Sequence, residues 1–157
     1  MKIELLVIGK NNDKYVEQGV KLFEERLTHY CNFELKILPG VRKAQKYAPA
    51  NLIQQEAEII MRYVKKEDYI ILLDETGKDY TSIEFSSYIN KKNLSSMKKI
   101  VFIIGGAYGF SPLIYQMAKE RISLSKMTFS HQMVRIFFLE QLYRAFTILN
   151  DEPYHNF

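Results

Sequence analysis

The sequence predicts one α/β domain, residues 1–157, built on a mostly parallel sheet with helices on both faces. Short apolar runs rich in Ile, Val and Leu recur along the chain, and each is too short for a helix. Longer segments with apolar residues at three- and four-residue steps separate these runs, and strand alternating with helix is typical of a parallel sheet. Glycines directly follow one buried run, as at the ligand crevice of an open α/β sheet.

The first half of the chain alternates twice between strand and helix. Residues 2–8 are mostly apolar, as in a buried strand, and residues 33–38 alternate as a second strand. A helix follows Asp13, its expected cap. The apolar face of this helix consists of Val16, Val20, Phe23, Leu27 and Tyr30. A second helix over residues 50–64 has an apolar side, with Glu56 on the opposite, polar side.

A third strand is predicted over residues 69–73, and it ends in a polar turn over residues 74–78. Asp74 and Glu75 in that turn are explained by simple solvation at least as well as by a chemical role. A third helix begins at Thr81.

The rest of the chain is organised around an apolar run and the glycines after it. Residues 100–104 predict a strand buried on both faces, and Gly105, Gly106 and Gly109 follow it at once. Glycines at this position let the backbone turn sharply and leave its N–H groups accessible to a ligand. A glycine pattern of this kind alone is weak evidence for a nucleotide site, because it lacks the dinucleotide spacing.

A second predicted strand ends about twenty residues after the first in the sequence. Ser111 is placed to cap a short helix, with Pro112 at its first position. A strand over residues 121–124 then ends in the polar turn 125–128. The last helix, residues 132–149, is apolar over more than one narrow stripe, so we expect it to pack on its own sheet and on a second copy of the chain.

Composition is that of an ordinary globular domain, with 47% hydrophobic and 25% charged residues and a net charge of +4. No apolar run is long enough for a membrane span, and no signal peptide precedes the first strand, so we expect a cytoplasmic protein without a membrane partner. Cys31 is the single cysteine, which excludes an internal disulfide. We expect no metal, because His, Cys and Asp residues do not occur at ligand spacings.

Arg42, Lys43 and Lys46 form a basic loop, which is equally consistent with a solvated loop and with contact to an anionic partner. Among the histidines, His131 is interpreted as a cap or packing residue. His155 follows Tyr154 in the tail, where the pair has no packing reason to exist unless the tail docks over a site.

Three strings of residues together carry a family resemblance: IGGAYGF, SLSKMTFSHQMVR and EQLYRAFTILNDEPYH. With LLVIGK near the start, they resemble the RlmH family of SPOUT-class, S-adenosylmethionine-dependent methyltransferases that act on ribosomal RNA. The resemblance covers most of the chain. It implies a C-terminal trefoil knot, here in about residues 70–157, a topology that general rules of chain connection would not suggest.

The resemblance also implies which residues hold the cofactor S-adenosylmethionine. In this family the cofactor lies bent in the knot and is held largely by backbone groups. The matching positions are Leu73, Gly105, Leu124, Ser125, Lys126, Met127, Thr128 and Phe129. Apolar side chains in this set can enclose an adenine while free amides and carbonyls read its edges.

The implied reaction is transfer of the cofactor's methyl group to N3 of a pseudouridine in 23S rRNA, on the assembled 70S ribosome. That nitrogen becomes a nucleophile only as its proton leaves, so negative charge on the ring must be stabilised. Arg144 is assigned this electrostatic role because its guanidinium stays charged and offers paired donors. His155 is assigned to accept the proton or position the base, and Tyr154 to stack on the base or donate a hydrogen bond.

The family also implies a homodimer that packs through the last helix, with the tail of one copy completing the site of the other. One departure concerns the tail, because members commonly have a basic residue after PYH, whereas this chain has Asn156 and Phe157. If that residue contacts RNA phosphate, this protein uses another group, for which Arg42, Lys43 and Lys46 are candidates.

Two alternatives of other classes remain at this point. One is an RNA- or ribosome-binding protein that has the same fold and no catalysis. The other is a small α/β protein that binds a different nucleotide at the glycine turn. Neither explains why SLSKMTF and YRAF occur together.

Overall fold

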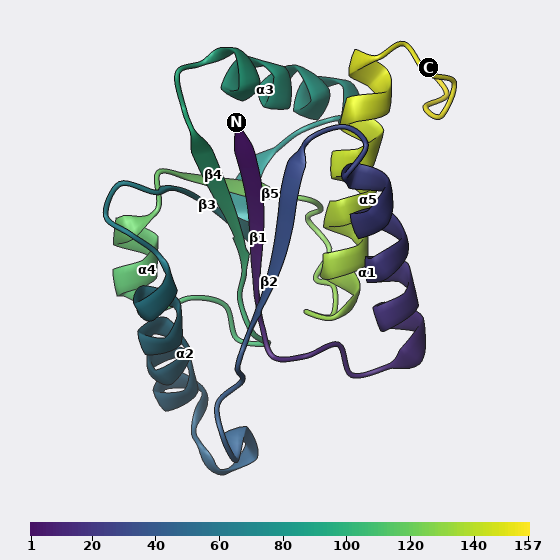
Figure 1. Cartoon of the computed structure of the whole chain (residues 1–157). Helices are drawn as coiled ribbons and strands as arrows, with labels where there is room; N and C mark the ends of the chain where they lie inside the picture. The colour runs from purple at the N-terminus through teal and green to yellow at the C-terminus, as the bar shows by residue number, and fades with distance from the viewer.

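The computed structural model describes all 157 residues, and it contains one five-stranded sheet flanked by helices (Figure 1). Neighbouring strands are all parallel, in the order β2-β1-β4-β3-β5. The strands are β1 (Lys2–Ile8), β2 (Asn32–Leu38), β3 (Tyr69–Asp79), β4 (Lys99–Ile104) and β5 (Glu120–Ser123). Because all the strands are parallel, their carboxyl ends lie at one edge of the sheet.

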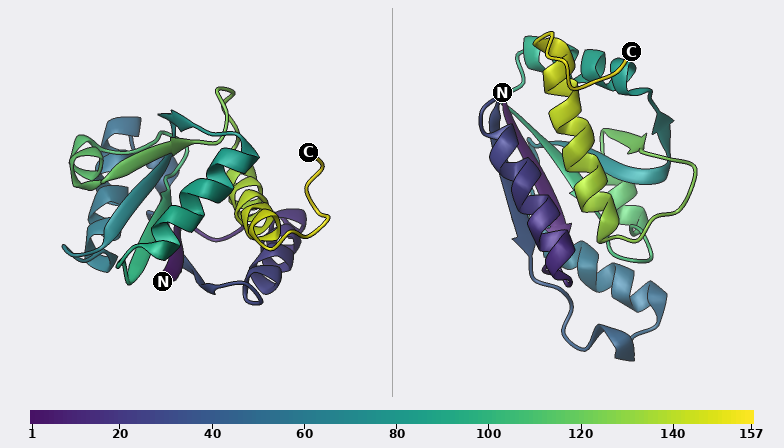
Figure 2. Two further views of the ribbon diagram at one scale, coloured as in Figure 1. Left: turned by 90° about the horizontal axis from the view of Figure 1, so that it is seen from above. Right: turned by 90° about the vertical axis from the view of Figure 1, so that its right-hand side faces the viewer.

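Helices cover both faces of the sheet, which confirms the predicted architecture (Figure 2). The helices are α1 (Lys14–Leu27), α2 (Pro49–Tyr63), α3 (Ser82–Leu94), α4 (Pro112–Met117) and α5 (Met133–Leu149). Side chains of α1, α3 and α5 pack on one face, and those of α2 and α4 pack on the other. A short 3-10 turn, Ala44–Lys46, lies in the basic loop.

The core consists of two layers, one on each side of the sheet. In β4, Phe102 faces the layer under α5, with its ring centroid 4.8 Å from that of Phe138, while Val101 faces the layer under α2 and α4. A strand buried on both faces needs apolar residues at every position, which explains the continuous runs in the sequence. Each large side chain buried in this way contributes about 1.5–3 kcal/mol.

All three helices with a predicted cap begin where the sequence indicates, and two of the three caps form a side-chain hydrogen bond. Thr81 caps α3, its Oγ1 accepting from the N–H of Glu84 at 3.1 Å while the Glu84 carboxylate accepts from the Thr81 N–H at 2.8 Å. Ser111 caps α4 with a single bond, its Oγ accepting from the N–H of Ile114 at 3.3 Å. Asp13 precedes α1 as predicted, but its side chain makes no capping bond. The prediction of Tyr30 on that helix was wrong, because α1 ends at Leu27.

Strand β3 is longer than predicted and contains a polar protrusion. Both Leu73 and Lys78 pair with Ile122 of β5, so residues 74–77 project out of the ladder at the carboxyl edge. The strand then resumes to Asp79, where a turn was predicted up to residue 78. A Cβ on Gly77 would lie 2.6 Å from backbone atoms of β5, so only glycine fits this close approach.

The prediction that Glu56 lies on the polar side of its helix was wrong. Its side chain is turned toward the protein and the residue is only 7% exposed. The reason is a tertiary contact, since the N–H of Gly106 donates a hydrogen bond of 3.2 Å to Glu56 Oε2.

None of the helices is both long and apolar enough to cross a lipid bilayer. The trefoil knot in about residues 70–157 stays a prediction.

Candidate active site

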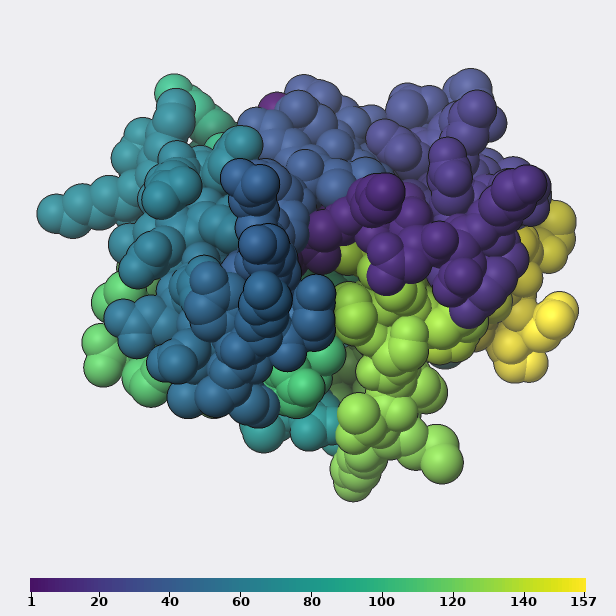
Figure 3. All heavy atoms as spheres, turned by 90° about the horizontal axis from the view of Figure 1, so that it is seen from below, coloured from purple at the N-terminus to yellow at the C-terminus, as the bar shows by residue number.

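A cavity of about 360 Å³ lies at the carboxyl edge of the sheet. Three segments form its walls: the protrusion of β3, the glycine turn after β4 and the loop after β5. Figure 3 looks onto this edge, where the light-green loop after β5 projects from the surface. A cavity between the ends of neighbouring parallel strands is the usual ligand position in an open α/β sheet.

The glycine turn presents backbone to the cavity. Gly106 and Gly109 form an isolated bridge, closed by a hydrogen bond of 3.3 Å from the Gly109 N–H to the Gly106 carbonyl. Gly109 has a φ of +82°, a conformation that other residues rarely adopt. At Gly106, a Cβ would lie 2.5 Å from either oxygen of the Glu56 carboxylate. Gly109 is therefore required by its backbone conformation, whereas at Gly106 the Glu56 carboxylate occupies the place of a side chain.

A carboxylate and a phenol face each other on the β3 side of the cavity. The hydroxyl of Tyr115, on α4, donates to Asp74, which also accepts from the N–H of Thr76 at 2.9 Å. Burial raises the pKa of Asp74, but these hydrogen bonds outweigh burial and lower its pKa overall. Burial and the Asp74 carboxylate together raise the pKa of Tyr115 to about 12. At neutral pH the pair is therefore a carboxylate held by a neutral phenol.

The loop after β5 is fixed by its own hydroxyl groups. Ser123 donates to the carbonyl of Ser125 at 2.9 Å, and the Ser125 hydroxyl accepts from the N–H of Met127 at 3.0 Å. Thr128 donates to the carboxylate of Glu75 at 2.8 Å and so connects this loop to the protrusion of β3. The first two bonds fix the loop itself, and the bond from Thr128 to Glu75 holds two walls of the cavity together.

The structure brings nearly all the predicted cofactor residues to this cavity. Leu73, Gly105, Leu124, Ser125, Met127, Thr128 and Phe129 line it. Lys126, in the same loop, does not line it.

Sequence reasoning missed several lining residues whose position depends on tertiary packing, Tyr115, His131 and Val134 among them. Tyr115 reaches the cavity from α4, and His131 reaches it from the start of α5. Of the two interpretations of His131, as a cap or as a packing residue, the first was wrong, since Gln132 occupies the N-cap position of α5, while the residue is half-buried as in the second. Burial lowers the pKa of His131, and the nearby Arg135 adds to this effect. The signal in the sequence was the closeness of His131 to the loop after β5.

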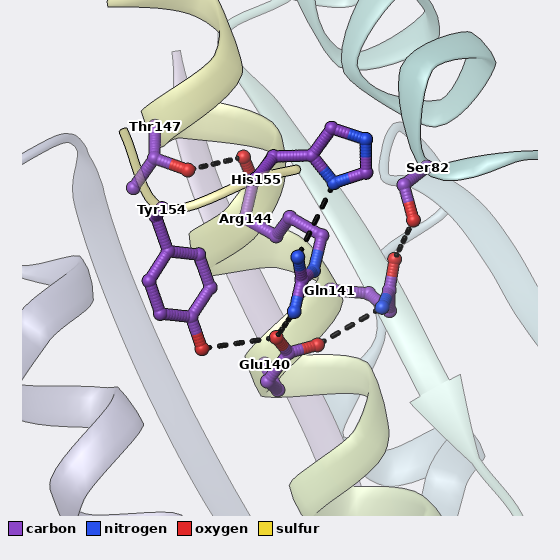
Figure 4. A network of polar contacts seen from close by, with 7 residues as sticks. All are labelled: Ser82, Glu140, Gln141, Arg144, Thr147, Tyr154 and His155. Atoms are coloured by element: carbon purple, nitrogen blue, oxygen red, sulfur yellow. Dashed lines mark hydrogen bonds and ion pairs between the residues drawn. The ribbon is translucent and has the colours of Figure 1, made fainter. Parts of the chain in front are cut away.

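The three predicted catalytic residues lie together at the other end of α5 (Figure 4). Arg144 forms an ion pair with Glu140 one helical turn earlier, and its Nη1 lies 3.2 Å from His155 Nδ1. The Tyr154 hydroxyl donates to Glu140 at 3.0 Å, and the Arg144 guanidinium lies 4.8 Å from the centroid of the Tyr154 ring. Sequence reasoning missed Glu140, which contacts both Arg144 and Tyr154.

The terminal tail is docked on the body of the protein. Tyr154 packs edge-on against Tyr143, with ring centroids 4.8 Å apart, and Glu152 accepts a hydrogen bond of 2.7 Å from Tyr30. Burial and the Glu140 carboxylate raise the pKa of Tyr154. The docked tail gives the Tyr-His pair the packing reason that the sequence alone did not supply.

Within one chain, none of Arg144, Tyr154 and His155 lines the cavity. The structure therefore contains two separate features. A ligand cavity lies near the first residues of α5, and a polar cluster of Glu140, Arg144, Tyr154 and His155 lies near its last residues. No three His, Cys, Asp or Glu side chains lie close enough to hold a metal ion.

A parallel sheet with helices on both faces and a cavity formed by a glycine turn at its carboxyl edge defines an α/β ligand-binding protein. The chain belongs to the SPOUT methyltransferase family, whose model, described as "Predicted SPOUT methyltransferase", matches residues 1–155.

Its relatives match over almost their full length. A protein of Parabacteroides distasonis is 48% identical over 156 residues, which are 99% of each chain. Proteins of Christiangramia forsetii and Porphyromonas gingivalis are 49% and 47% identical over the same share of each chain. All three relatives are named "Ribosomal RNA large subunit methyltransferase H".

Proposed function

We propose that this protein transfers a methyl group from S-adenosylmethionine to N3 of a pseudouridine in 23S rRNA, with the assembled 70S ribosome as its substrate. The family and the names of the full-length relatives support this function. The observation that carries it in this chain is the cavity between the glycine turn and the loop after β5, lined by all but one of the residues expected to hold the cofactor.

The chemistry of the cavity fits this cofactor. Leu73, Ile104 and Leu124 give an apolar wall for an adenine, and the glycine turn offers backbone groups to its edges. Asp74 and Glu75 add negative charge for a cofactor that carries a sulfonium and an ammonium group. When bound, S-adenosylmethionine supplies an electrophilic methyl group.

The polar cluster on α5 supplies charge and hydrogen bonds for the acceptor base. The Arg144 guanidinium, oriented by Glu140, stabilises negative charge on the uracil ring as the N3 proton leaves. His155 has a ring nitrogen next to Arg144 and accepts the proton or positions the base. Tyr154 offers a ring for stacking and a hydroxyl for hydrogen bonding.

We further propose that the protein acts as a homodimer in which the tail of one copy completes the site of the other. The separation of the cavity from the cluster within one chain supports this arrangement. So does Phe137 on α5, which remains 38% exposed although it is a large apolar residue. Sedimentation of a fully active monomer in dilute solution would contradict the dimer.

The function is tested by incubating the protein and labelled S-adenosylmethionine with 70S ribosomes that lack the modification. Isolated subunits and free rRNA are incubated in parallel. We expect label in 23S rRNA at N3 of a pseudouridine, with most incorporation into 70S ribosomes. Arg144→Ala is expected to abolish transfer, and Arg62→Ala, at an exposed position of α2, serves as the control. Ribosome binding without incorporation by the unmodified protein would favour the alternative of a non-catalytic binding protein.

A further inference from the structure

Glu56 is a buried acid without a cationic partner. The residue is 7% exposed and no Lys, Arg or His forms an ion pair with it. Its hydrogen-bond partner is the backbone N–H of Gly106, at 3.2 Å. Burial raises the pKa of Glu56, and the bond from Gly106 offsets this in part. A buried carboxylate with so little compensation is costly, and such groups occur preferentially at functional sites.

The carboxylate lies directly behind the wall of the cavity. Both of its oxygens are 2.5 Å from the point where a Cβ of Gly106 would be, so they occupy the space that a side chain would fill. Gly106 itself lines the cavity. The absence of a side chain on Gly106 therefore lets a negative charge lie close to a bound ligand, on a residue that is only 7% exposed.

The two forms of the proposed cofactor differ in charge at one atom. Methyl transfer breaks the bond between sulfur and the methyl carbon and forms a bond between that carbon and N3, while the N3 proton passes to a base, for which His155 is the candidate. The sulfur keeps the electron pair, so a cationic sulfonium becomes the neutral thioether of S-adenosylhomocysteine. A nearby negative charge in a poorly solvated position favours the cation over the neutral product.

We propose that Glu56 is a specificity-determining residue that makes the cavity prefer the cationic cofactor S-adenosylmethionine to its neutral product. This inference rests on the proposed function. Glu56 acts through the gap left by Gly106 and touches neither the reacting carbon nor the acceptor base. Its effect is to retain the substrate form of the cofactor and to weaken retention of the product.

The other carboxylates of the cavity are less suited to this role. Asp74 is engaged by Tyr115 and Thr76, and Glu75 is engaged by Thr128. Glu75 is also exposed, so water and salt screen its charge. Removing the charge of Glu75 should therefore change the preference between the two ligands less than removing the charge of Glu56.

The test measures the dissociation constants of S-adenosylmethionine and S-adenosylhomocysteine by calorimetry. Glu56→Gln removes the charge and keeps an amide oxygen that can accept from Gly106. We expect it to weaken binding of S-adenosylmethionine about tenfold, with the affinity for S-adenosylhomocysteine unchanged to within about twofold. Glu58→Gln, an exposed position on the same helix, is the matched control, and Glu75→Gln is the comparison for a screened charge.

Glu56→Met, a second neutral variant of similar length, gives the same comparison if the Gln variant does not fold. If the affinities for both ligands fell equally, the proposal would be overturned. Glu56 would then only stabilise the glycine turn. Unchanged affinities for both ligands would also overturn it. If the unmodified protein bound neither ligand, the proposed function would fail instead, and the two failures are therefore distinguishable.

Discussion

The Thr128 hydroxyl donates a hydrogen bond of 2.8 Å to the carboxylate of Glu75, and this contact joins the loop after β5 to the protrusion of β3 across the cavity. Both residues are exposed, so the bond contributes little to overall stability but limits the positions of two walls.

Replacing Thr128 by Val keeps the shape of the side chain and removes the hydroxyl. We expect the affinity for S-adenosylmethionine to fall about two- to fivefold, because one hydrogen bond contributes roughly 0.5–1 kcal/mol. The melting temperature should change little. Calorimetric titration and thermal unfolding measure the two effects. Thr28→Val, which removes an exposed hydroxyl at the end of α1, is the control. A large loss of stability in Thr128→Val would contradict a role confined to the cavity.

Replacing Gly106 by Ala should distort the glycine turn, because the new Cβ would lie 2.5 Å from the Glu56 carboxylate. We expect a loss of stability of about 1–3 kcal/mol, typical of overpacking, together with weaker cofactor binding. Adding Glu56→Ala to this variant removes the clash and should restore part of the stability. Gly40→Ala is the control, since its Cβ would meet the Cα of Gly9 at an ordinary 3.6 Å. Additive losses in the double variant would refute the clash.

Glu120 should make stability depend on pH. Burial raises the pKa of Glu120, but hydrogen bonds from Tyr88, Lys92 and Tyr69 lower it by more than burial raises it. The net pKa therefore lies below the ordinary 4.5. A lowered pKa in the folded protein stabilises it above the ordinary pKa of the acid, and this contribution is lost as pH falls through the lowered value. Glu120→Gln should therefore cost about 1–3 kcal/mol at pH 7, and the difference should shrink below about pH 4. Urea unfolding across this pH range measures it. A difference independent of pH would contradict the assignment.

Glu140 should position Arg144 without touching the cofactor. Glu140→Gln removes the anion that fixes the guanidinium and weakens the contact with Tyr154. We expect kcat for methyl transfer to fall about tenfold or more, as when a group that positions a catalytic residue is lost. Cofactor affinity should stay unchanged. Glu140→Asp should recover part of kcat, and Glu58→Gln is the control. An equal fall in cofactor affinity would indicate a general structural defect.

Strand positions could be predicted because their cause is local in the sequence. A strand such as β4 is buried on both faces, so every position from Ile100 to Ile104 must be apolar. The extension of β3 could not be predicted in the same way. Residues 74–77 are polar because they protrude, and the strand resumes only because Lys78 meets Ile122 of β5, a pairing that helical or strand periodicity does not encode.

The residues of the site also fall into two groups, those predictable from the local sequence and those placed by tertiary packing. Gly105 and the loop after β5 could be found from a glycine turn, a short strand and the family resemblance. Tyr115 and His131 could not, because they reach the cavity through the packing of α4 and α5. Periodicity assigned Glu56 to the solvent side because charged residues usually lie there, and only the contact with Gly106, far along the chain, explains its burial.

Strand β1 has neighbours on both edges, and one of them comes from far along the chain, since Lys2 pairs with Asn32 on one side and with Lys99 on the other. During synthesis, the first strand to emerge can find β2 early but must wait for β4. The backbone N–H and C=O groups on that edge of β1 therefore remain unpaired until about two thirds of the polypeptide has been made. Strand pairings between residues this distant in sequence form slowly, and until they form the unpaired strand edge is prone to aggregation. We expect refolding from urea to be slower than that of helical proteins of equal length, and truncated chains that end before β4 to aggregate.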